Sequence, residues 1–354
     1  MRIAVDGTTM RDGAGIGQYT RSVVAAMRSV LGTDLFVWEP KRRVPFLTRH
    51  VNLALVATMK MVDVLFCPAN QSPLCWTGKT VVTVHDLTIY EHPEWFPKTK
   101  LDFAAKFLVP RSLRRADAIV AISEATKRQI GRVFPDVVDK VVVVYPGTSN
   151  QVSPPHREEG SGVVVATSDT ILFVGTLEPR KNLVNALAAF DAFLRMHRDR
   201  AATTRFVIAG GIGWNAEPIL EAIAQTNDAW RSIAGGNVVR QIGYVTEEEK
   251  ANLYAQASCF FFPSWEEGFG LPVLEAMAAG VPVIASNRGA LPEVGGDAVM
   301  YVEPDDVEQM AFAIAQCVMM PEALGEMVAA AKARAGEFTW ERCAREVLTV
   351  VEKV

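Results

Sequence analysis

Short apolar, β-branched runs alternate along this chain with longer stretches of helical period. In the first half the runs are IAVDG, DVLFC, TVVTV, AIVAI and VVVVY, and in the second half they are TILFVG, RFVIAGG, SCFFFP and VPVIAS. Alternation of such runs with helical segments is typical of parallel sheets covered by helices. The pattern predicts an α/β protein built from two Rossmann-like, doubly wound parallel sheets.

The alternation stops once, at the polar segment GTSNQVSPPHREEGSG that starts at residue 147. This segment has little to bury and contains residues that break both periods. The chain length of 354 residues also suits two hydrophobic cores. We expect one domain over residues 1–160 and a second over residues 161–339, followed by an amphipathic helix over residues 340–354.

Charge is divided unevenly between the halves, although the net charge is only −4. Residues 1–150 hold 20 Lys and Arg against 13 Asp and Glu, and the remainder holds 16 against 27. The basic half has no recognition-helix pattern or stacking motif, so nucleic acid is a poor partner. Basic residues that flank apolar positions near residues 41–60 and 98–115 favour peripheral contact with an anionic membrane, although a solvated helix face gives the same pattern.

No apolar stretch reaches the length of a membrane-spanning helix, and the N-terminus runs directly into a strand-like segment. We therefore expect a cytoplasmic protein. The five cysteines lack metal-ligand spacing and lie mostly in apolar runs, so they are interpreted as buried, reduced thiols.

Two adjacent cations, Arg180 and Lys181, follow the run TILFVG and precede a helical pattern that starts near Leu183. A strand end beside a helix N-terminus is a natural anion site. The pair would balance about two negative charges of a diphosphate. An exposed basic pair on a surface loop is the alternative.

A second motif, PSWEEGFGLPVLEAM, follows the buried run CFFF. Glu267 would lie in a bend that Gly268 and Gly270 permit, and Glu275 would lie early in the next helix. The segment Gly268–Leu271, which includes Phe269, would present N–H groups to phosphate, and Glu275 would accept hydrogen bonds from a ribose diol. The alternative is that both acids only cap and solvate a helix start.

Three weaker features complete the candidate site. His85 and Asp86 follow TVVTV, where a histidine is also common as a hydrogen-bonded core residue. Gly15 and Gly17 are interpreted as part of a flexible loop that approaches the donor phosphates or the acceptor, with a plain turn as the alternative. Gly211 lies in a glycine bend after RFVIA.

Taken together, these motifs closely resemble family 4 of the retaining glycosyltransferases, also called group 1. TLEPRKNL, the two glutamates separated by seven residues, GIGQYT, TVHDL, AISEATK, VIAGGIGW, GALPEVGGDA and FTWERCA all occur in the family's order. The resemblance implies a GT-B fold with an interdomain cleft, an acceptor-side first domain, a nucleotide-sugar-binding second domain and a C-terminal helix that packs back on the first. It further implies that His85 and Asp86 lie by the donor sugar, that Arg180 and Lys181 bind diphosphate, that Glu267 contacts the sugar and that Glu275 holds ribose.

The implied reaction is retaining transfer of a hexose from a nucleotide-diphosphate sugar to a glycan or lipid-linked acceptor. The blocks most resemble the bacterial GDP-mannose-dependent branch of surface polysaccharide synthesis, with UDP-glucose, dTDP-rhamnose and GDP-fucose as alternative donors. We expect no metal and no other cofactor, because two cations already match the phosphate charge and no Asp-x-Asp follows a strand. A nucleotide-sugar epimerase, a catalytically silent nucleotide-sugar-binding scaffold and a dehydrogenase are the competing classes. Arg288 departs from the small residue expected there, and it would contact a substrate or pair with a surface acid.

Overall fold

The computed structural model describes residues 1–13, 15–31, 35–39, 46–98, 104–148 and 169–354. The expected domain boundary at residue 160 lies outside these residues. The described chain divides into two compact units. Unit 1 comprises Met1–Pro93, Pro97–Gly147 and Phe338–Val354, and unit 2 comprises Glu94–Phe96 and Thr148–Glu337.

Unit 1 contains a six-stranded parallel sheet in the order β2-β1-β3-β4-β5-β6. Its strands are β1 (Ile3–Asp6), β2 (Leu35–Trp38), β3 (Val64–Cys67), β4 (Lys79–Val84), β5 (Ala118–Ala121) and β6 (Val141–Val143). Its helices are α1 (Gly15–Leu31), α2 (Phe46–Met59), α3 (Thr88–Glu91), α5 (Val109–Arg115), α6 (Glu124–Val133) and α14 (Trp340–Glu352).

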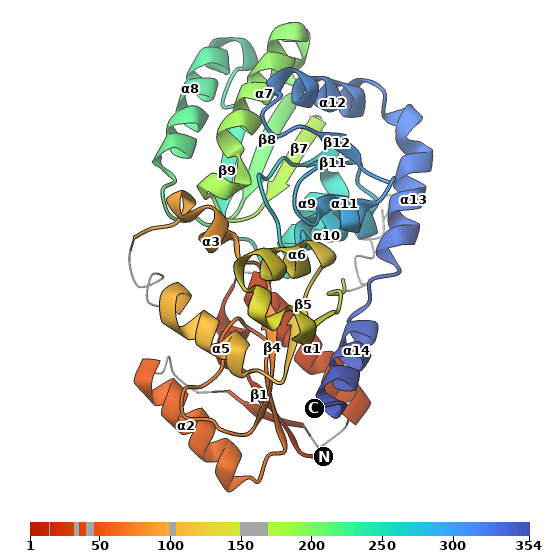
Figure 1. Cartoon of the computed structure of the whole chain (residues 1–354). Helices are drawn as coiled ribbons and strands as arrows, with labels where there is room; N and C mark the ends of the chain where they lie inside the picture. Colours follow the sequence, from red (N-terminus) through yellow and green to blue (C-terminus); the bar gives the residue numbers. More distant parts are fainter. Residues whose placement is uncertain (14, 32–34, 40–45, 99–103, 149–168) are drawn as a thin grey trace. The chain divides into compact units, whose positions relative to one another are not determined.

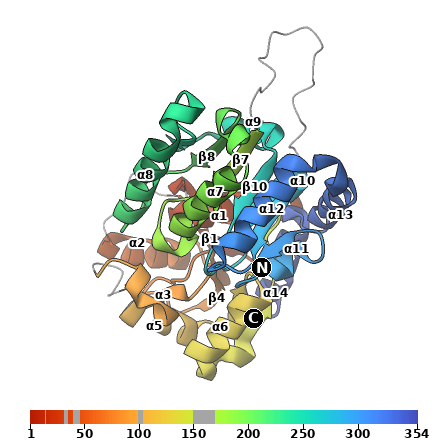
Figure 2. The same cartoon turned by 90° about the horizontal axis from the view of Figure 1, so that it is seen from above.

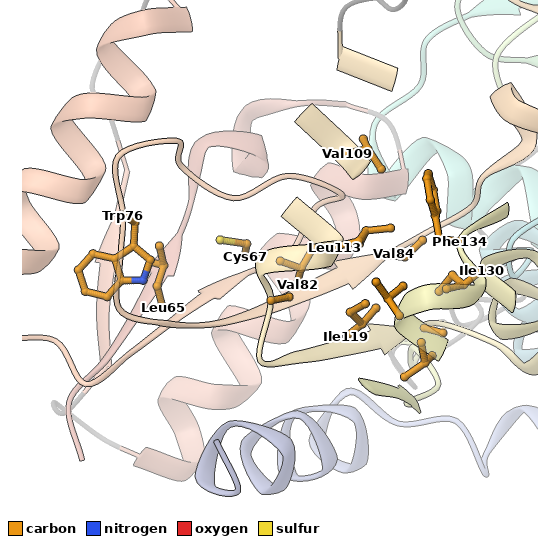
Figure 3. Packing of buried hydrophobic residues seen from close by; sticks show 14 of the residues in the cluster. Leu65, Cys67, Trp76, Val82, Val84, Val109, Leu113, Ile119, Ile130 and Phe134 are labelled. Carbon is orange, nitrogen blue, oxygen red and sulfur yellow. The ribbon is translucent and has the colours of Figure 1, made fainter. Parts of the chain in front are cut away.

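One face of this sheet carries a hydrophobic core that α2, α5 and α6 cover. Val82 and Val84 of β4 point into it together with Ile119 of β5, since every second residue of a strand faces the same side (Figure 3). Leu113 of α5 and Ile130 of α6 pack against these strand residues. The core therefore holds the strands whose carboxyl ends carry His85 and its neighbours.

The C-terminal helix α14 belongs to unit 1, where it packs along α1 (Figure 1). Its apolar stripe is buried, and Trp340 and Val347 are 7% and 0% exposed. Trp340 also contacts the ring of Tyr19 on α1 edge to face, with ring centroids 5.8 Å apart. An amphipathic helix is stabilised when its apolar stripe is buried and its polar face stays in contact with water.

Unit 2 contains a second six-stranded parallel sheet, in the order β12-β11-β10-β7-β8-β9. Its strands are β7 (Asp169–Val174), β8 (Thr204–Ala209), β9 (Val239–Gly243), β10 (Cys259–Phe262), β11 (Val283–Ser286) and β12 (Met300–Val302). Its helices are α7 (Leu183–Met196), α8 (Glu217–Ala234), α9 (Glu247–Gln256), α10 (Leu271–Ala279), α11 (Leu291–Gly295), α12 (Val307–Met319) and α13 (Gly325–Ala335). Helices α7 and α12 lie side by side, as do α10 and α13 (Figure 2).

The two parallel sheets confirm the predicted fold class, and every predicted apolar run forms a strand. Three further strands, β2, β9 and β12, were not predicted. All three lie at the edges of their sheets, where strands are only partly buried. In β9 (VRQIG) polar residues interrupt the apolar positions, as is common in a strand that is not buried on both faces, whereas β2 (LFVW) and β12 (MYV) are short apolar runs that were not recognised as strands.

Within the described residues, no single helix is long and apolar enough to cross a membrane, although the bent pair Val307–Met319 and Pro321–Ala335 passes the same test by length and composition.

Candidate active site

The strand order of unit 2 reverses between β7 and β10, so the loops after these two strands diverge to opposite sides of the sheet. Such a reversal point, at the carboxyl ends of the strands, is where open α/β sheets bind ligands. Arg180 and Lys181 lie in a short 3-10 turn after β7, and Glu267 lies in the loop after β10. The Trp265 N–H donates to the Arg180 carbonyl at 2.9 Å, which joins the two loops.

The carboxylate of Glu267 bridges both cations. Its Oε1 lies 2.5 Å from Lys181 Nζ, and its Oε2 lies 2.8 Å from Arg180 Nη1. Glu267 and Lys181 are each 7% exposed, so the expected alternative of an exposed basic pair is wrong. Burial alone would raise the pKa of Glu267, but Arg180 and Lys181 outweigh burial and lower this pKa to about 2.

Glu178 holds the other edge of the Arg180 guanidinium. Its Oε1 accepts hydrogen bonds from Arg180 Nε at 3.1 Å and Nη2 at 2.8 Å, while Nη1 also donates to the Glu266 carbonyl at 2.8 Å. Glu178 is 4% exposed. Glu178 lies inside the motif TLEPRKNL, and no role was predicted for it. Its position two residues before Arg180, in a turn, could have indicated that the two side chains pair.

These four side chains, Glu178, Arg180, Lys181 and Glu267, are called the charge cluster below. Two carboxylates and two cations give it a formal charge of zero. Burial lowers the pKa of Lys181, as does the like charge of Arg180, while Glu267 and Glu178 act in the opposite direction. The cations that we expected to meet a diphosphate are therefore already paired within the protein.

A second polar group surrounds Glu275 on α10. Lys250 Nζ lies 2.9 Å from Glu275 Oε1, and the Tyr254 hydroxyl donates to Oε2 at 3.1 Å. Burial opposes the charge of Lys250, but Glu275 and Glu247 raise its pKa. Lys250 and Tyr254 both come from α9, and no motif spacing in the sequence linked them to Glu275.

The bend before α10 forms as expected, and the helix begins at Leu271. Gly270 caps it with a φ of +99°, a conformation that favours glycine, and an added Cβ would lie 2.6 Å from a methyl carbon of Leu291. No side chain caps this helix, and Glu267 and Glu275 are both buried. The alternative that the two acids only cap and solvate the helix start is wrong. Gly268 and Phe269 complete the bend, and Phe269 is buried.

The glycine bend after β8 runs beside the loop after β7. The Gly211 carbonyl accepts a hydrogen bond from the Leu177 N–H at 2.9 Å. At Gly210 an added Cβ would lie 1.8 Å from the Gly175 carbonyl oxygen, whereas at Gly211 it would meet nothing within 4 Å. Close backbone packing therefore requires glycine at position 210, and Gly211 leaves open space beside the loop.

In unit 1, His85 follows β4 and is 8% exposed. Its Nε2 lies 2.8 Å from the Pro68 carbonyl, and because a carbonyl only accepts, Nε2 carries the hydrogen. The ring packs edge to face against Tyr19, with centroids 4.9 Å apart. Burial lowers the pKa of His85, although Pro68 and Asp86 oppose this shift. The side chain is thus a hydrogen-bonded neutral imidazole, as the core alternative required, and its role at the sugar stays a prediction.

The backbone around His85 is also committed to hydrogen bonds. The Thr126 hydroxyl donates to the His85 carbonyl at 3.1 Å, and the His85 N–H donates to Asn70 Oδ1 at 3.0 Å. Asp86 accepts from the Thr88 N–H through Oδ1 at 3.2 Å. These contacts fix His85 and Asp86 at the carboxyl end of β4.

Gly15 and Gly17 do not form the flexible loop that we expected, because α1 begins at Gly15 and both residues lie in its first turn. An added Cβ at Gly17 would lie 2.0 Å from the Asp12 carbonyl oxygen, whereas at Gly15 it would meet nothing within 4 Å. Glycine is needed at position 17 because two backbone segments approach closely there.

The structure also bears on the expectations for Arg288 and for the five cysteines. Arg288 pairs with Glu303 at 2.9 Å, and both side chains are about half exposed, which supports the surface-pair alternative. Four cysteines are buried thiols outside any disulfide, as expected, but Cys75 is exposed. Within the described residues, no group of three or more His, Cys, Asp or Glu side chains is arranged to hold a metal ion.

The fold and the position of the charge cluster define a class, the GT-B glycosyltransferases. The whole chain superimposes on sucrose-phosphate synthase from Thermosynechococcus elongatus with a TM-score of 0.78 and 18% identity, covering 100% of this chain and 98% of that one. It also superimposes on Anabaena Alr3699/HepE in complex with UDP and glucose, with a TM-score of 0.74, 17% identity and full coverage of both chains. At these identities the likeness shows the fold.

The sequence comparisons identify the family. Residues 168–319 match the model for glycosyl transferases group 1, and residues 30–151 match that for glycosyltransferase family 4. O-antigen chain mannosyltransferase B of Escherichia coli is 33% identical over 275 residues, which cover 76% of this chain and 69% of the relative. O-antigen chain mannosyltransferase RfbU of Salmonella typhimurium is 23% identical over 344 residues, covering 89% and 90%. The chain belongs to glycosyltransferase family 4, and it is a glycosyltransferase.

Proposed function

We propose that this enzyme transfers mannose from GDP-mannose to a glycan or lipid-linked oligosaccharide in the synthesis of a bacterial surface polysaccharide such as O-antigen. The observation that carries this proposal is the 33% identity to O-antigen chain mannosyltransferase B over 275 residues. A second relative, RfbU, is an O-antigen chain mannosyltransferase as well. The UDP and UDP-glucose in the Anabaena structures are bound to one protein, Alr3699/HepE, which shares only the fold with this chain.

We assign the donor to unit 2. The diphosphate would be met by Arg180, Lys181 and the N–H groups at the start of α10, and the ribose diol would be held by Glu275. Breaking the anomeric bond places extra negative charge on the diphosphate, so these cations would act most strongly in the transition state. Because they supply the charge that a bound metal would supply, we propose that transfer is metal-independent.

We further propose that the reaction retains the anomeric configuration, with front-side attack and the departing phosphate as the base. His85 of unit 1 would stabilise the sugar, and Glu267 would fix its orientation through a hydroxyl. Product stereochemistry, read from the anomeric coupling constants by NMR, tests this part separately. An inverted product would contradict it and leave the donor assignment intact.

The test of the donor is a thermal-shift panel of GDP, UDP, dTDP and ADP with magnesium or with EDTA, followed by product analysis with the matching sugar nucleotides. Selective binding to the folded protein raises its apparent stability. We expect a shift with GDP alone, equal with and without magnesium, and transfer from GDP-mannose. A shift with UDP or dTDP instead would overturn the mannose assignment, and a shift that needs magnesium would overturn metal independence.

We also propose that α2 docks peripherally on the cytoplasmic face of an anionic membrane, where a lipid-linked acceptor would lie. Val51, Leu55 and Met59 are spaced four residues apart on one helix face, and they are 44%, 56% and 74% exposed. Lys60 follows directly and is exposed, and residues 1–150 carry an excess of seven positive charges. An apolar helix face with adjacent cations is the arrangement that binds anionic lipid surfaces.

Sedimentation with phosphatidylglycerol vesicles tests this docking surface. The double variant Leu55→Glu/Met59→Glu should lose vesicle binding, whereas Phe312→Glu should keep it, because Phe312 is equally exposed, at 66%, but belongs to unit 2. Phosphatidylcholine vesicles should bind neither the wild type nor either variant. Equal binding by the double variant and the wild type would contradict the proposal.

A further inference from the structure

Glu267 stands in the position that a diphosphate would need. Its two oxygens contact Lys181 Nζ and Arg180 Nη1 at 2.5 and 2.8 Å, and these are the cationic groups assigned to the donor. Because the charge cluster is already neutral and buried, adding a diphosphate would leave it with two or more uncompensated negative charges. Uncompensated buried charge is strongly unfavourable. The donor therefore cannot simply add to the contacts that the cluster makes at rest.

The two carboxylates of the cluster differ in how they hold Arg180. Glu178 lies two residues away on the same turn and contacts the Nε and Nη2 edge of the guanidinium. Glu267 comes from another loop, 86 residues away in the sequence from Lys181, and contacts the Nη1 side. Arg180 can therefore change its partner on the Nη1 side while Glu178 keeps the guanidinium in place.

We propose that Glu267 is a displaceable counter-ion, which the donor diphosphate replaces on Arg180 and Lys181, and that Glu178 is the positioning residue that holds Arg180 during the exchange. This inference rests on the proposed donor site in unit 2. Once released, the Glu267 carboxylate has two free acceptor oxygens beside the diphosphate, where the sugar hydroxyls of the donor lie. Diphosphate binding thereby creates the hydrogen-bond acceptor that orients the sugar, so the two events are coupled.

The exchange predicts opposite effects of one substitution on binding and on transfer. Glu267→Gln removes the competing charge, so inorganic pyrophosphate and GDP should bind at least tenfold more tightly than to the wild type. Sugar transfer should fall at least tenfold, because an amide is a weaker acceptor for the hydroxyl. A residue that only supported the fold would weaken binding and transfer together.

The matched control is Glu266→Gln, which makes the same change of charge one residue away. The Glu266 backbone carbonyl accepts a hydrogen bond from Arg180 at 2.8 Å, and the substitution keeps that carbonyl. Calorimetric titration at constant ionic strength should show pyrophosphate affinity within about threefold of the wild type for Glu266→Gln. An increase equal to that of Glu267→Gln would reduce the effect to net charge and overturn the proposal.

A second variant covers the case in which Glu267→Gln does not fold. Glu267→Asp keeps the charge and withdraws it by one methylene, so it should bridge the two cations less well and raise pyrophosphate affinity about threefold. Unchanged or weaker pyrophosphate binding by either folded variant would overturn the counter-ion exchange. If neither GDP nor pyrophosphate binds to the wild type, the donor site itself fails, and that outcome is distinct because it appears before any substitution is made.

Discussion

The two units share one architecture but differ in what they bury at the carboxyl ends of their strands. In unit 2 this edge carries Lys181 and Glu267 in direct contact, with Arg180 and Glu178 beside them. In unit 1 it carries the neutral His85 among amide, hydroxyl and carbonyl partners, and no lysine or arginine among the described residues of that unit is buried. The common fold thus gives both units the same kind of strand edge. The side chains at that edge determine the charge of the ligand that it could bind.

The largest expected effect comes from a substitution that breaks the charge cluster of unit 2. Arg180→Met leaves Glu178 buried without its partner, so it should lower the free energy of unfolding by about 3–5 kcal/mol. Transfer should fall about 100- to 1000-fold, because the variant loses the guanidinium hydrogen-bond donor that would stabilise the negative charge developing on the diphosphate. Urea unfolding and a transfer assay measure the two effects.

The double variant Arg180→Met/Glu178→Gln separates stability from chemistry. Removing the orphaned carboxylate should restore part of the lost stability and none of the transfer. Recovery of transfer together with stability would show that Arg180 only supports the fold, and the contrast between the two units would lose its functional meaning.

A smaller effect is expected within unit 2, where Glu275→Gln should separate the proposed ribose site from the proposed phosphate site. Glu275→Gln should weaken GDP binding about 10- to 100-fold, since hydrogen bonds to charged groups contribute about 1.5–3 kcal/mol. Pyrophosphate has no ribose and should bind at least as tightly as before, because Lys250 loses one of its two carboxylate partners and keeps only Glu247. Calorimetry with both ligands checks this.

Tyr254→Phe is the milder companion of Glu275→Gln. It removes one neutral donor to Glu275 and leaves Lys250 in place, so GDP affinity should fall about 2- to 10-fold. Equal losses of GDP and pyrophosphate affinity in Glu275→Gln would mean that the two polar groups act as one site.

The third prediction concerns the neutral edge of unit 1. Burial lowers the pKa of His85, so the unfolded chain binds the proton first as the pH falls below about 6.5. The stability gained from the neutral imidazole is complete above that pH, and it is lost at lower pH by up to about 1.4 kcal/mol per pH unit. His85→Gln, whose amide can still donate to Pro68, should flatten this part of the stability profile in urea titrations at several pH values.

His197→Gln is the control for the loss of an imidazole elsewhere, and it should leave the slope in place. A slope that persists in His85→Gln would show that another group dominates the acid limb.

The smallest expected effect is at the surface of unit 2. Arg288→Ala breaks the half-exposed pair with Glu303, and exposed pairs contribute at most about 1 kcal/mol. Thermal unfolding should change little, and transfer should stay within about twofold of the wild type. A large loss of transfer with unchanged stability would place Arg288 at a substrate after all.

The sequence by itself determined the two parallel sheets, their central strands, the family and the position of the motifs. These follow from local signals, because strands buried on both faces are written as continuous apolar runs and each motif lies within a few residues of such a run. The edge strand β9 (VRQIG) mixes polar and apolar residues, β2 (LFVW) and β12 (MYV) are apolar runs of only four and three residues, and Gly15 and Gly17 fit a loop and a helix start equally well.

Only the tertiary structure decided which partners the motif residues take. Glu267 meets Lys181 across 86 residues of sequence, and Glu275 meets Lys250 and Tyr254 from a neighbouring helix. The choice between an exposed cation and a buried, neutralised one depends on how the loops pack over the strand ends. That packing brings together residues far apart in the chain, so no local sequence pattern predicts it.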